Sequence, residues 1–203
     1  FASTGNAEEI FSLKTAPDET NGSNNLGQIY NPQGYGDIRV TSDIRDSYEA
    51  GDLRTALYYQ NTDGEYYVGK FLGEEGVPGL VSTKIFRLAE MHLIRAEARA
   101  KQSDFVGATE DVDVIRTRAG LAALGSNVDL DGVLAEKNRE FAFEGHRTFD
   151  LWRNGKPLVR VQANTGLEIS APAFIAADSY LRVYPIPQTE LDVNPEITQA
   201  PGY

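Results

Sequence analysis

Residues 83–119, TKIFRLAEMHLIRAEARAKQSDFVGATEDVDVIRTRA, decide the fold of this chain. Their apolar residues recur at steps of three and four, the spacing that places side chains on one face of an α-helix. We expect Thr83 to cap a first helix that ends near Lys101, and Ser103 to cap a second that ends before Gly120. The apolar positions of the two helices are Ile85, Leu88, Ala89, His92 and Ala96, then Phe105, Ala108, Val112, Ile115 and Ala119.

The link between the two helices is very short, Gln102–Ser103. A link of this length predicts an antiparallel helical hairpin of tetratricopeptide type. No internal repeat accompanies it, although arrays of such hairpins repeat at a fixed period. Small residues that allow the two helices to approach closely are Ala96, Ala98, Ala100 and Ala108.

A third long helix is predicted from Asp129 to Gly145, with Val133, Leu134, Phe141 and Ala142 buried. Beyond Arg153 the pattern becomes irregular, with a short extended piece at residues 181–186. Proline ends helices because it lacks an N–H group, so the tail cannot stay helical for long. Five of the nine prolines lie there: Pro172, Pro185, Pro187, Pro195 and Pro201.

The first 82 residues are of a different kind, rich in Gly, Asn, Asp and Tyr. They predict a short strand at 9–14, a short helix at 42–50 and a hairpin formed by 56–60 and 65–71. We therefore expect a loop-rich region at 1–82 and a helical region at 83–203, joined in one structural unit. The fold class predicted is mainly α: a tetratricopeptide-like hairpin, a third long helix, extended irregular loops and minor β structure.

The composition excludes several classes of function. A net charge of -11 argues against nucleic acid, because binding phosphates needs clustered Lys and Arg, and it favours a neutral ligand over a polyanion. There is no cysteine, so disulfides and thiol chemistry are absent. Neither a signal peptide at the N-terminus nor an apolar run of about 18 residues is found in the sequence.

Glu140 and Glu144 lie one helical turn apart, as two acid/base carboxylates might be arranged. Glycosidic cleavage needs roughly 5–10 Å between the two carboxyl groups, and side chains one turn apart usually lie closer than that. We therefore favour a structural ion-pair network with Arg139, Arg147 and Arg153. This interpretation predicts that Glu144 and Arg147 are substantially buried and bonded to protein.

No catalytic residue, cofactor or metal site is expected. His92 and His146 are the only histidines, and His92 is interpreted as a hydrogen-bonded core residue rather than a metal ligand. The acidic pairs lack the twelve-residue loop of an EF-hand, although a calcium site built from loop carbonyls stays open. The sequence contains neither a phosphate-binding glycine loop nor a nucleophile elbow.

Three segments, in order, resemble the SusD/RagB family. The first is FRLAEMHLIRAEA at 86–98, followed by Asp104 and VIRTRAGL at 114–121. The second is EFAFEGHRTFDLWR at 140–153. The third is YPIPQTE at 184–190, with Asn194-Pro195 and a terminal QAPGY. Weaker matches reach toward the N-terminus, so the resemblance covers nearly the whole chain.

The resemblance implies a non-enzymatic nutrient-binding protein, lipid-anchored on the extracellular face of a Bacteroidetes-type outer membrane. Its partner would be a SusC-like, TonB-dependent transporter on which it acts as a lid, and its ligand an oligosaccharide or polysaccharide. Two alternatives stay open: capture of peptides, as in the RagB branch, and a scaffold that binds only the barrel. Family members are about twice this length. An N-terminal half with the signal peptide and lipidated cysteine is therefore expected to be missing here.

The candidate ligand-binding residues are Tyr30, Asn31, Gln33, Tyr35 and Asp37. They combine aromatic faces with groups that hydrogen-bond hydroxyls, and they fall in a predicted loop, where binding residues are concentrated. A second candidate set in the hairpin is Tyr58, Tyr59, Tyr66 and Tyr67. The alternative is that these tyrosines only pack the loops onto the helices, and the sequence does not decide between the two. Trp152 is expected to pack against the helical core.

Overall fold

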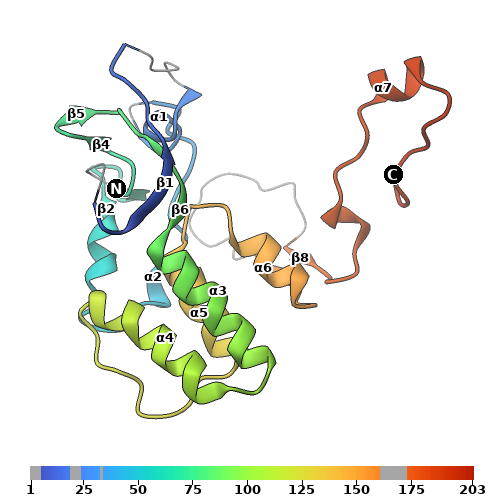
Figure 1. Ribbon diagram of the computed structural model, residues 1–203. Helices are drawn as coiled ribbons and strands as arrows, with labels where there is room; N and C mark the ends of the chain where they lie inside the picture. Colours follow the sequence, from blue (N-terminus) through green and yellow to red (C-terminus); the bar gives the residue numbers. More distant parts are fainter. Residues whose placement is uncertain (1–5, 19–23, 33, 161–172) are drawn as a thin grey trace.

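The computed structural model describes residues 6–18, 24–32, 34–160 and 173–203. Helices α3 (Leu88–Lys101) and α4 (Phe105–Arg118) form the predicted hairpin, and α5 (Leu130–Glu140) packs against both. Figure 1 shows these three helices close together, with the strands of the first 87 residues above them in this view. The expectation of a mainly α fold with minor β structure is confirmed.

The interface of these helices is a core of small and branched side chains. Ala96, Ala100 and Ala108 are buried there as predicted, whereas Ala98 is exposed. Leu93 and Val133 are both 0% exposed at its centre. The members of this helical core are Ala89, Leu93, Ala96, Ala100, Ala108, Val112, Ile115, Val133 and Phe141.

The first predicted helix starts later than expected. Thr83 is no cap: β6 (Thr83–Arg87) is a strand that pairs antiparallel with β1 (Glu9–Leu13). Ile85 lies on it and is 38% exposed rather than buried. Hydrogen bonding to a strand more than 70 residues away in sequence overrides the helical spacing of the apolar residues, because propensity is weaker than tertiary pairing.

The second helix is capped by Asp104 instead of Ser103. Ser103 has a φ of 63°, a left-handed conformation that turns the chain between the helices. The N-cap is therefore the next residue, Asp104. Its carboxylate accepts a hydrogen bond of 3.0 Å from the Gly107 N–H.

Replacing Asp104 with alanine is expected to lower the free energy of unfolding by about 1 kcal/mol, because a helix N-terminal N–H loses its acceptor. Urea denaturation would measure this change. Glu110, exposed on the same helix, is the matched control, and its replacement with alanine should change the stability by less than about 0.5 kcal/mol. Equal effects of the two substitutions would contradict the capping role.

The third helix ends at Glu140, not at Gly145. Phe143 has a φ of 66°, which no helix tolerates, and residues 141–145 form turns before α6 (Arg147–Arg153) begins. Because the helix ends early, its last carbonyls lack N–H donors from a following helical turn. Buried cations donate to carbonyls in this region instead. Lys70 donates to the carbonyls of Glu140 and Ala142, and Arg87 to that of Glu140.

The first 82 residues form short elements around a second core. The predicted hairpin consists of β2 (Tyr58–Gln60) and β3 (Tyr66–Val68), preceded by the 3-10 helix η2 (Leu53–Leu57). The other elements there are α1 (Leu26–Ile29), α2 (Ser42–Asp46), and the paired strands β4 (Gly73–Glu74) and β5 (Val77–Pro78). The predicted helix at 42–50 is thus shorter than expected, and Thr41 precedes it. The buried core residues are Val40, Ile44, Val68, Phe71 and Val81.

The C-terminal segment extends away from the helices (Figure 1). Strands β7 (Leu158–Val159) and β8 (Phe174–Ile175) pair, and η3 (Tyr180–Arg182) and α7 (Gln188–Val193) follow. The extended piece predicted at 181–186 begins only after η3. The Gln199 amide holds this segment by exchanging two hydrogen bonds of 2.9 Å with the backbone of Ile186.

Candidate functional site

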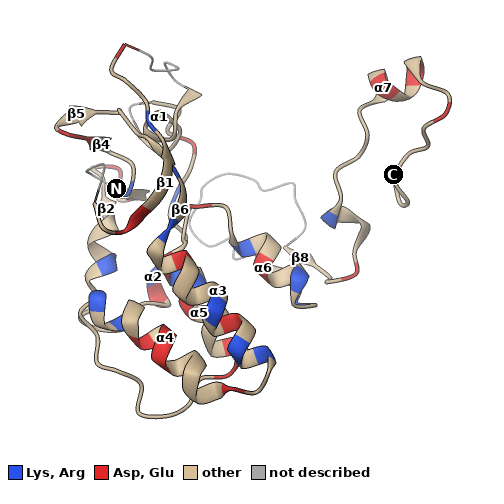
Figure 2. Ribbon diagram, viewed as in Figure 1, with Lys and Arg blue, Asp and Glu red and all other residues tan. Residues whose placement is uncertain are grey.

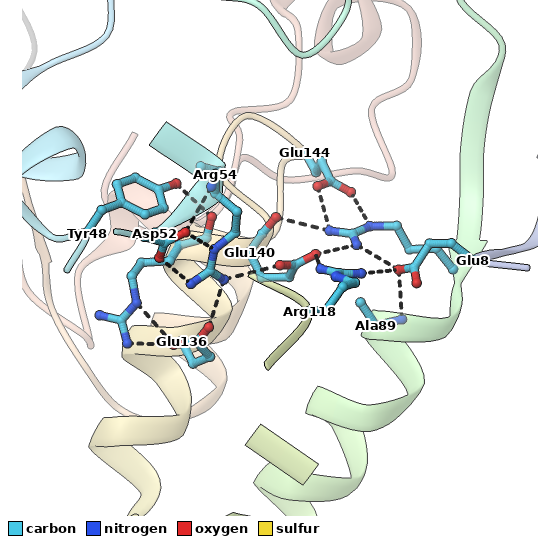
Figure 3. Close-up of polar contacts among 12 residues, drawn as sticks. Glu8, Tyr48, Asp52, Arg54, Ala89, Arg118, Glu136, Glu140 and Glu144 are labelled. Carbon is cyan, nitrogen blue, oxygen red and sulfur yellow. Dashed lines mark hydrogen bonds and ion pairs between the residues drawn. The ribbon is translucent and has the colours of Figure 1, made fainter. Parts of the chain in front are cut away.

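Glu140, at the C-terminal end of α5, is the centre of a buried charged network (Figure 3). Its side chain is 4% exposed and accepts from Arg87 and Arg118 at 2.5 Å each and from Arg54 at 3.2 Å. Burial alone would raise the pKa of Glu140, but the Arg87 and Arg118 guanidiniums hold it at about 2. The carboxylate therefore stays ionised at neutral pH.

The network extends from Glu140 in two directions. Arg54 also binds Asp52 and Glu136, both at 2.7 Å. On the other side, Glu144 accepts from Arg87 at 2.8 Å and from Lys70. Figure 3 shows Arg54, Arg118 and Glu136 pointing toward Glu140 from η2, α4 and α5.

The structural interpretation of Glu140 and Glu144 is confirmed, but the predicted partners were wrong. Arg139 pairs with Glu136, and Arg153 pairs with Glu97 and Asp150. Arg147 is exposed rather than buried, although it donates to the Leu134 carbonyl at 3.3 Å. Local spacing suggested these arginines, whereas the actual partners come from segments distant in sequence.

A cavity of about 450 Å³ opens beside this network. Cations and carboxylates both line it, and most of them are already paired with each other, so it offers little free charge to a ligand. Because Glu140 stays ionised at neutral pH, it does not itself supply the protonated acid that glycosidic cleavage requires. The lining residues are Asn6, Glu8, Glu9, Arg54, Leu57, Lys70, Lys84, Arg87, Arg118 and Glu140.

The candidate loop divides into a buried and an exposed part. Tyr30 stacks on Phe71, with ring centroids 5.2 Å apart, and its hydroxyl donates to the Phe143 carbonyl at 3.3 Å. Asn31 is half-buried. Tyr35 is 53% exposed, with its hydroxyl donating to Asn24, and Asp37 is exposed. Gln33 lies outside the described residues.

The hairpin tyrosines also have mainly structural contacts. Tyr58 hydrogen-bonds Tyr48 at 2.7 Å between the hydroxyls, and Tyr67 is 2% exposed with its hydroxyl donating to Asp63 at 2.8 Å. Tyr59 stacks on Tyr67, and the Arg45 guanidinium covers the Tyr66 ring at 3.9 Å. Packing thus occupies much of these rings.

A second cavity, of about 350 Å³, was not predicted. Its polar lining residues come from the start of α2, from α5 and from the start of α6, and Tyr30 and Phe143 also line it. About 90 residues of sequence separate α2 from α5 and α6, so no local pattern could have indicated the cavity. Its polar residues are Thr41, Asp43, Asn138, His146, Arg147 and Thr148.

His92 and Trp152 were also assigned structural roles from the sequence. His92 is half-buried, and its Nδ1 lies 3.3 Å from the Asp111 carboxylate, so the expected hydrogen bond is present. Trp152 is half-buried and lies outside the helical core, with the Arg182 guanidinium 5.9 Å from its ring centroid.

Metal and membrane features are limited in the part of the chain that the structure describes. There, no three His, Asp or Glu side chains are grouped so that they could hold a metal ion. None of the described helices combines the length and apolar character needed to cross a membrane. Figure 2 shows acidic and basic residues together on the same helices, α3 and α6 among them, rather than in one basic stripe.

Comparison with known proteins identifies relatives of this fold. The starch-binding protein SusD of Bacteroides thetaiotaomicron is 34% identical over 122 residues, which are 59% of this chain and 21% of that protein. A SusD superfamily protein from Bacteroides vulgatus superposes with a TM-score of 0.85 at 31% identity, covering 97% of this chain and 46% of that one. Another, from Bacteroides thetaiotaomicron, gives 0.85 at 26% identity and covers 98% and 50%.

This chain thus spans half or less of the length of these relatives. The sequence model of the SusD family itself matches residues 61–203, the range that carries α3 to α7 and all three recognised motifs. Since this range is more than half of the chain and the fold agrees with that of solved members, the chain belongs to the SusD family.

Proposed function

We propose that this protein is a non-enzymatic glycan-binding subunit of an outer-membrane nutrient uptake system. The observation that carries the proposal is the relationship to a starch-binding protein of the same family. The charged network supports a binding rather than a catalytic role, because its central carboxylate is ionised and saturated with guanidinium contacts. The net charge of -11 favours a neutral ligand.

The same proposal includes a partner and a location. The protein acts as a lid on a SusC-like, TonB-dependent transporter, and a lipid anchor in the part of the protein outside this chain holds it on the extracellular face of the outer membrane. The family membership supports both statements.

In the candidate loop, we assign different roles to the two tyrosines. Tyr30 anchors the loop through its contacts with Phe71 and Phe143. Tyr35 presents an exposed ring beside Asn31 and Asp37, and this combination suits stacking on a sugar with hydrogen bonds to its hydroxyls. The division 1–82 and 83–203 then separates the loop region that carries Tyr35 from the helical region that supports this loop.

Affinity electrophoresis of the chain tests the function. Native gels would contain soluble starch, levan, galactomannan or xylan, with a peptide mixture as a competitor in parallel lanes. Retardation by a polysaccharide that peptides do not relieve supports glycan capture. Retardation by none, together with binding of the peptides, would replace the proposal with peptide capture. Binding of neither, with retained association with the barrel, would leave a docking role.

Replacing Tyr35 with alanine is expected to weaken retardation by the bound glycan about tenfold, because a stacking face of roughly 1–1.5 kcal/mol is lost. Tyr184 is the matched control: it is 92% exposed, and its replacement with alanine should leave retardation unchanged. Neither change should alter the melting temperature by more than a few degrees. Unchanged binding by the Tyr35 variant would exclude the loop as the glycan site.

A further inference from the structure

The second cavity has the composition of a site for small polar molecules. Its volume of about 350 Å³ falls within the roughly 300–1,000 Å³ of known ligand pockets. Thr41 and Asp43 line it from the start of α2, and His146, Arg147 and Thr148 line it from the start of α6. Asn138 of α5 also belongs to the lining.

Several of these polar groups retain unused hydrogen-bonding capacity. Within the described ranges, Arg147 makes one side-chain hydrogen bond, of 3.3 Å to the Leu134 carbonyl, and no salt bridge, although a guanidinium has five N–H donors. In the same part of the chain, the Asn138 amide has no hydrogen-bond partner. Asp43 accepts from the Thr41 hydroxyl and keeps a further oxygen for a ligand.

The apolar residues that line the cavity are held by packing. Tyr30 and Phe143 pack edge to face, with centroids 5.6 Å apart, and the buried Ile44 also belongs to the lining. The His146 ring stacks on Phe141, with centroids 4.6 Å apart. Apolar lining of this kind accepts the C–H face of a ligand while the polar lining residues meet its polar groups.

The charges of the walls select among ligand classes. Asp43 and Arg147 carry opposite charges. The Asp43 carboxylate therefore repels an anionic ligand, and the Arg147 guanidinium repels a cationic one. A purely apolar ligand strips water from both charges and returns no hydrogen bond. A hydroxyl group donates to a carboxylate and accepts from a guanidinium or an amide, so a neutral polyhydroxylated ligand satisfies all the walls.

We propose that this cavity, between α2 and the start of α6, is a binding subsite for one neutral sugar unit of the glycan. The proposal rests on the proposed function and adds a site distinct from the exposed face of Tyr35. Asp43 accepts from a sugar hydroxyl, Asn138 and Arg147 donate to sugar oxygens, and Ile44 and Phe143 contact the ring.

Three single variants test the subsite: Arg147→Ala, Asn138→Ala and Asp43→Asn. Each would be run in the native gels with soluble starch, levan, galactomannan and xylan. Lys14→Ala is the control for the lost cation and Asp18→Asn for the lost carboxylate, since both residues are exposed outside the cavity. We expect each cavity variant to weaken retardation at least about tenfold, and each control to match the wild type.

The outcomes separate the subsite from the function. Wild-type retardation that survives all three cavity substitutions within twofold overturns the subsite and leaves glycan capture standing. A wild-type chain that none of the four polysaccharides retards overturns the proposed function and the subsite with it. Melting temperatures identify variants that fail to fold, and Asp43→Asn, which keeps the size of the side chain and its contact with Thr41, is the least disruptive of the three.

Discussion

Replacing Glu140 with alanine is expected to lower the free energy of unfolding by about 3–5 kcal/mol. The substitution removes the carboxylate that Arg54, Arg87 and Arg118 share, and leaves Arg54 and Arg87 buried with fewer counter-charges. An uncompensated buried charge costs far more than an exposed ion pair contributes. Denaturation in urea at neutral pH, with the unfolding followed by tryptophan fluorescence and circular dichroism, would measure the loss.

Two further variants make this result specific. Glu190, exposed on α7, is the matched control, and its replacement with alanine should change stability by less than about 0.5 kcal/mol. Glu140→Gln keeps the shape and one acceptor but removes the charge, so it should fall between the wild type and Glu140→Ala. A loss below about 1 kcal/mol for Glu140→Ala would show that the network does not depend on its central carboxylate.

Acidification is expected to remove a comparable amount of stability between pH 4.5 and pH 2. The pKa of both Glu140 and Glu97 is lowered to about 2 in the folded protein, from an ordinary value of 4.5. For Glu97, burial opposes the shift, and hydrogen bonds from Arg153, Asn154 and Lys137 outweigh it. The unfolded chain therefore binds more protons than the folded protein in this window, and stability falls as pH falls.

The expected size of this effect is about 3 kcal/mol for each carboxylate, since each unit of pKa difference corresponds to about 1.4 kcal/mol. The stabilisation is fully present above pH 4.5 and lost as pH approaches 2. Urea midpoints measured from pH 7 to pH 2 would trace it. In Glu140→Gln the slope below pH 4.5 should be about half that of the wild type; an unchanged slope would show that Glu140 is not one of the titrating groups.

The helical hairpin could be predicted from the sequence because its signal is local. Apolar residues at three- and four-residue steps place Ala89, Ala96 and Val112 in one core, whatever the rest of the chain does. The boundaries were less predictable. Residues 83–87 have a helical spacing too, and only their pairing with β1 makes them a strand.

The candidate site, too, could be predicted from the sequence only in part. The sequence identified a loop rich in tyrosine and asparagine, but it gave no sign that Tyr30 is an anchor while Tyr35 is exposed. Side-chain exposure depends on what packs above the loop, here Phe71 and Phe143, which lie about 40 and 110 residues away in sequence. The cavity lined by Asp43, Asn138 and Arg147 exists only because the start of α2 meets the α5–α6 region, about 90 residues further along the sequence.

By itself, the sequence determined the mainly α class, the hairpin, the family and the structural role of Glu140 and Glu144. Each of these follows from residue spacing along the chain or from motifs in a fixed order. Only the tertiary structure decided which cations neutralise those carboxylates, where α3 begins and α5 ends, and which polar groups line a common cavity. The physical reason is that ion pairs, strand pairing and cavities are formed by groups close in space, and such distances are set by the packing of the whole chain.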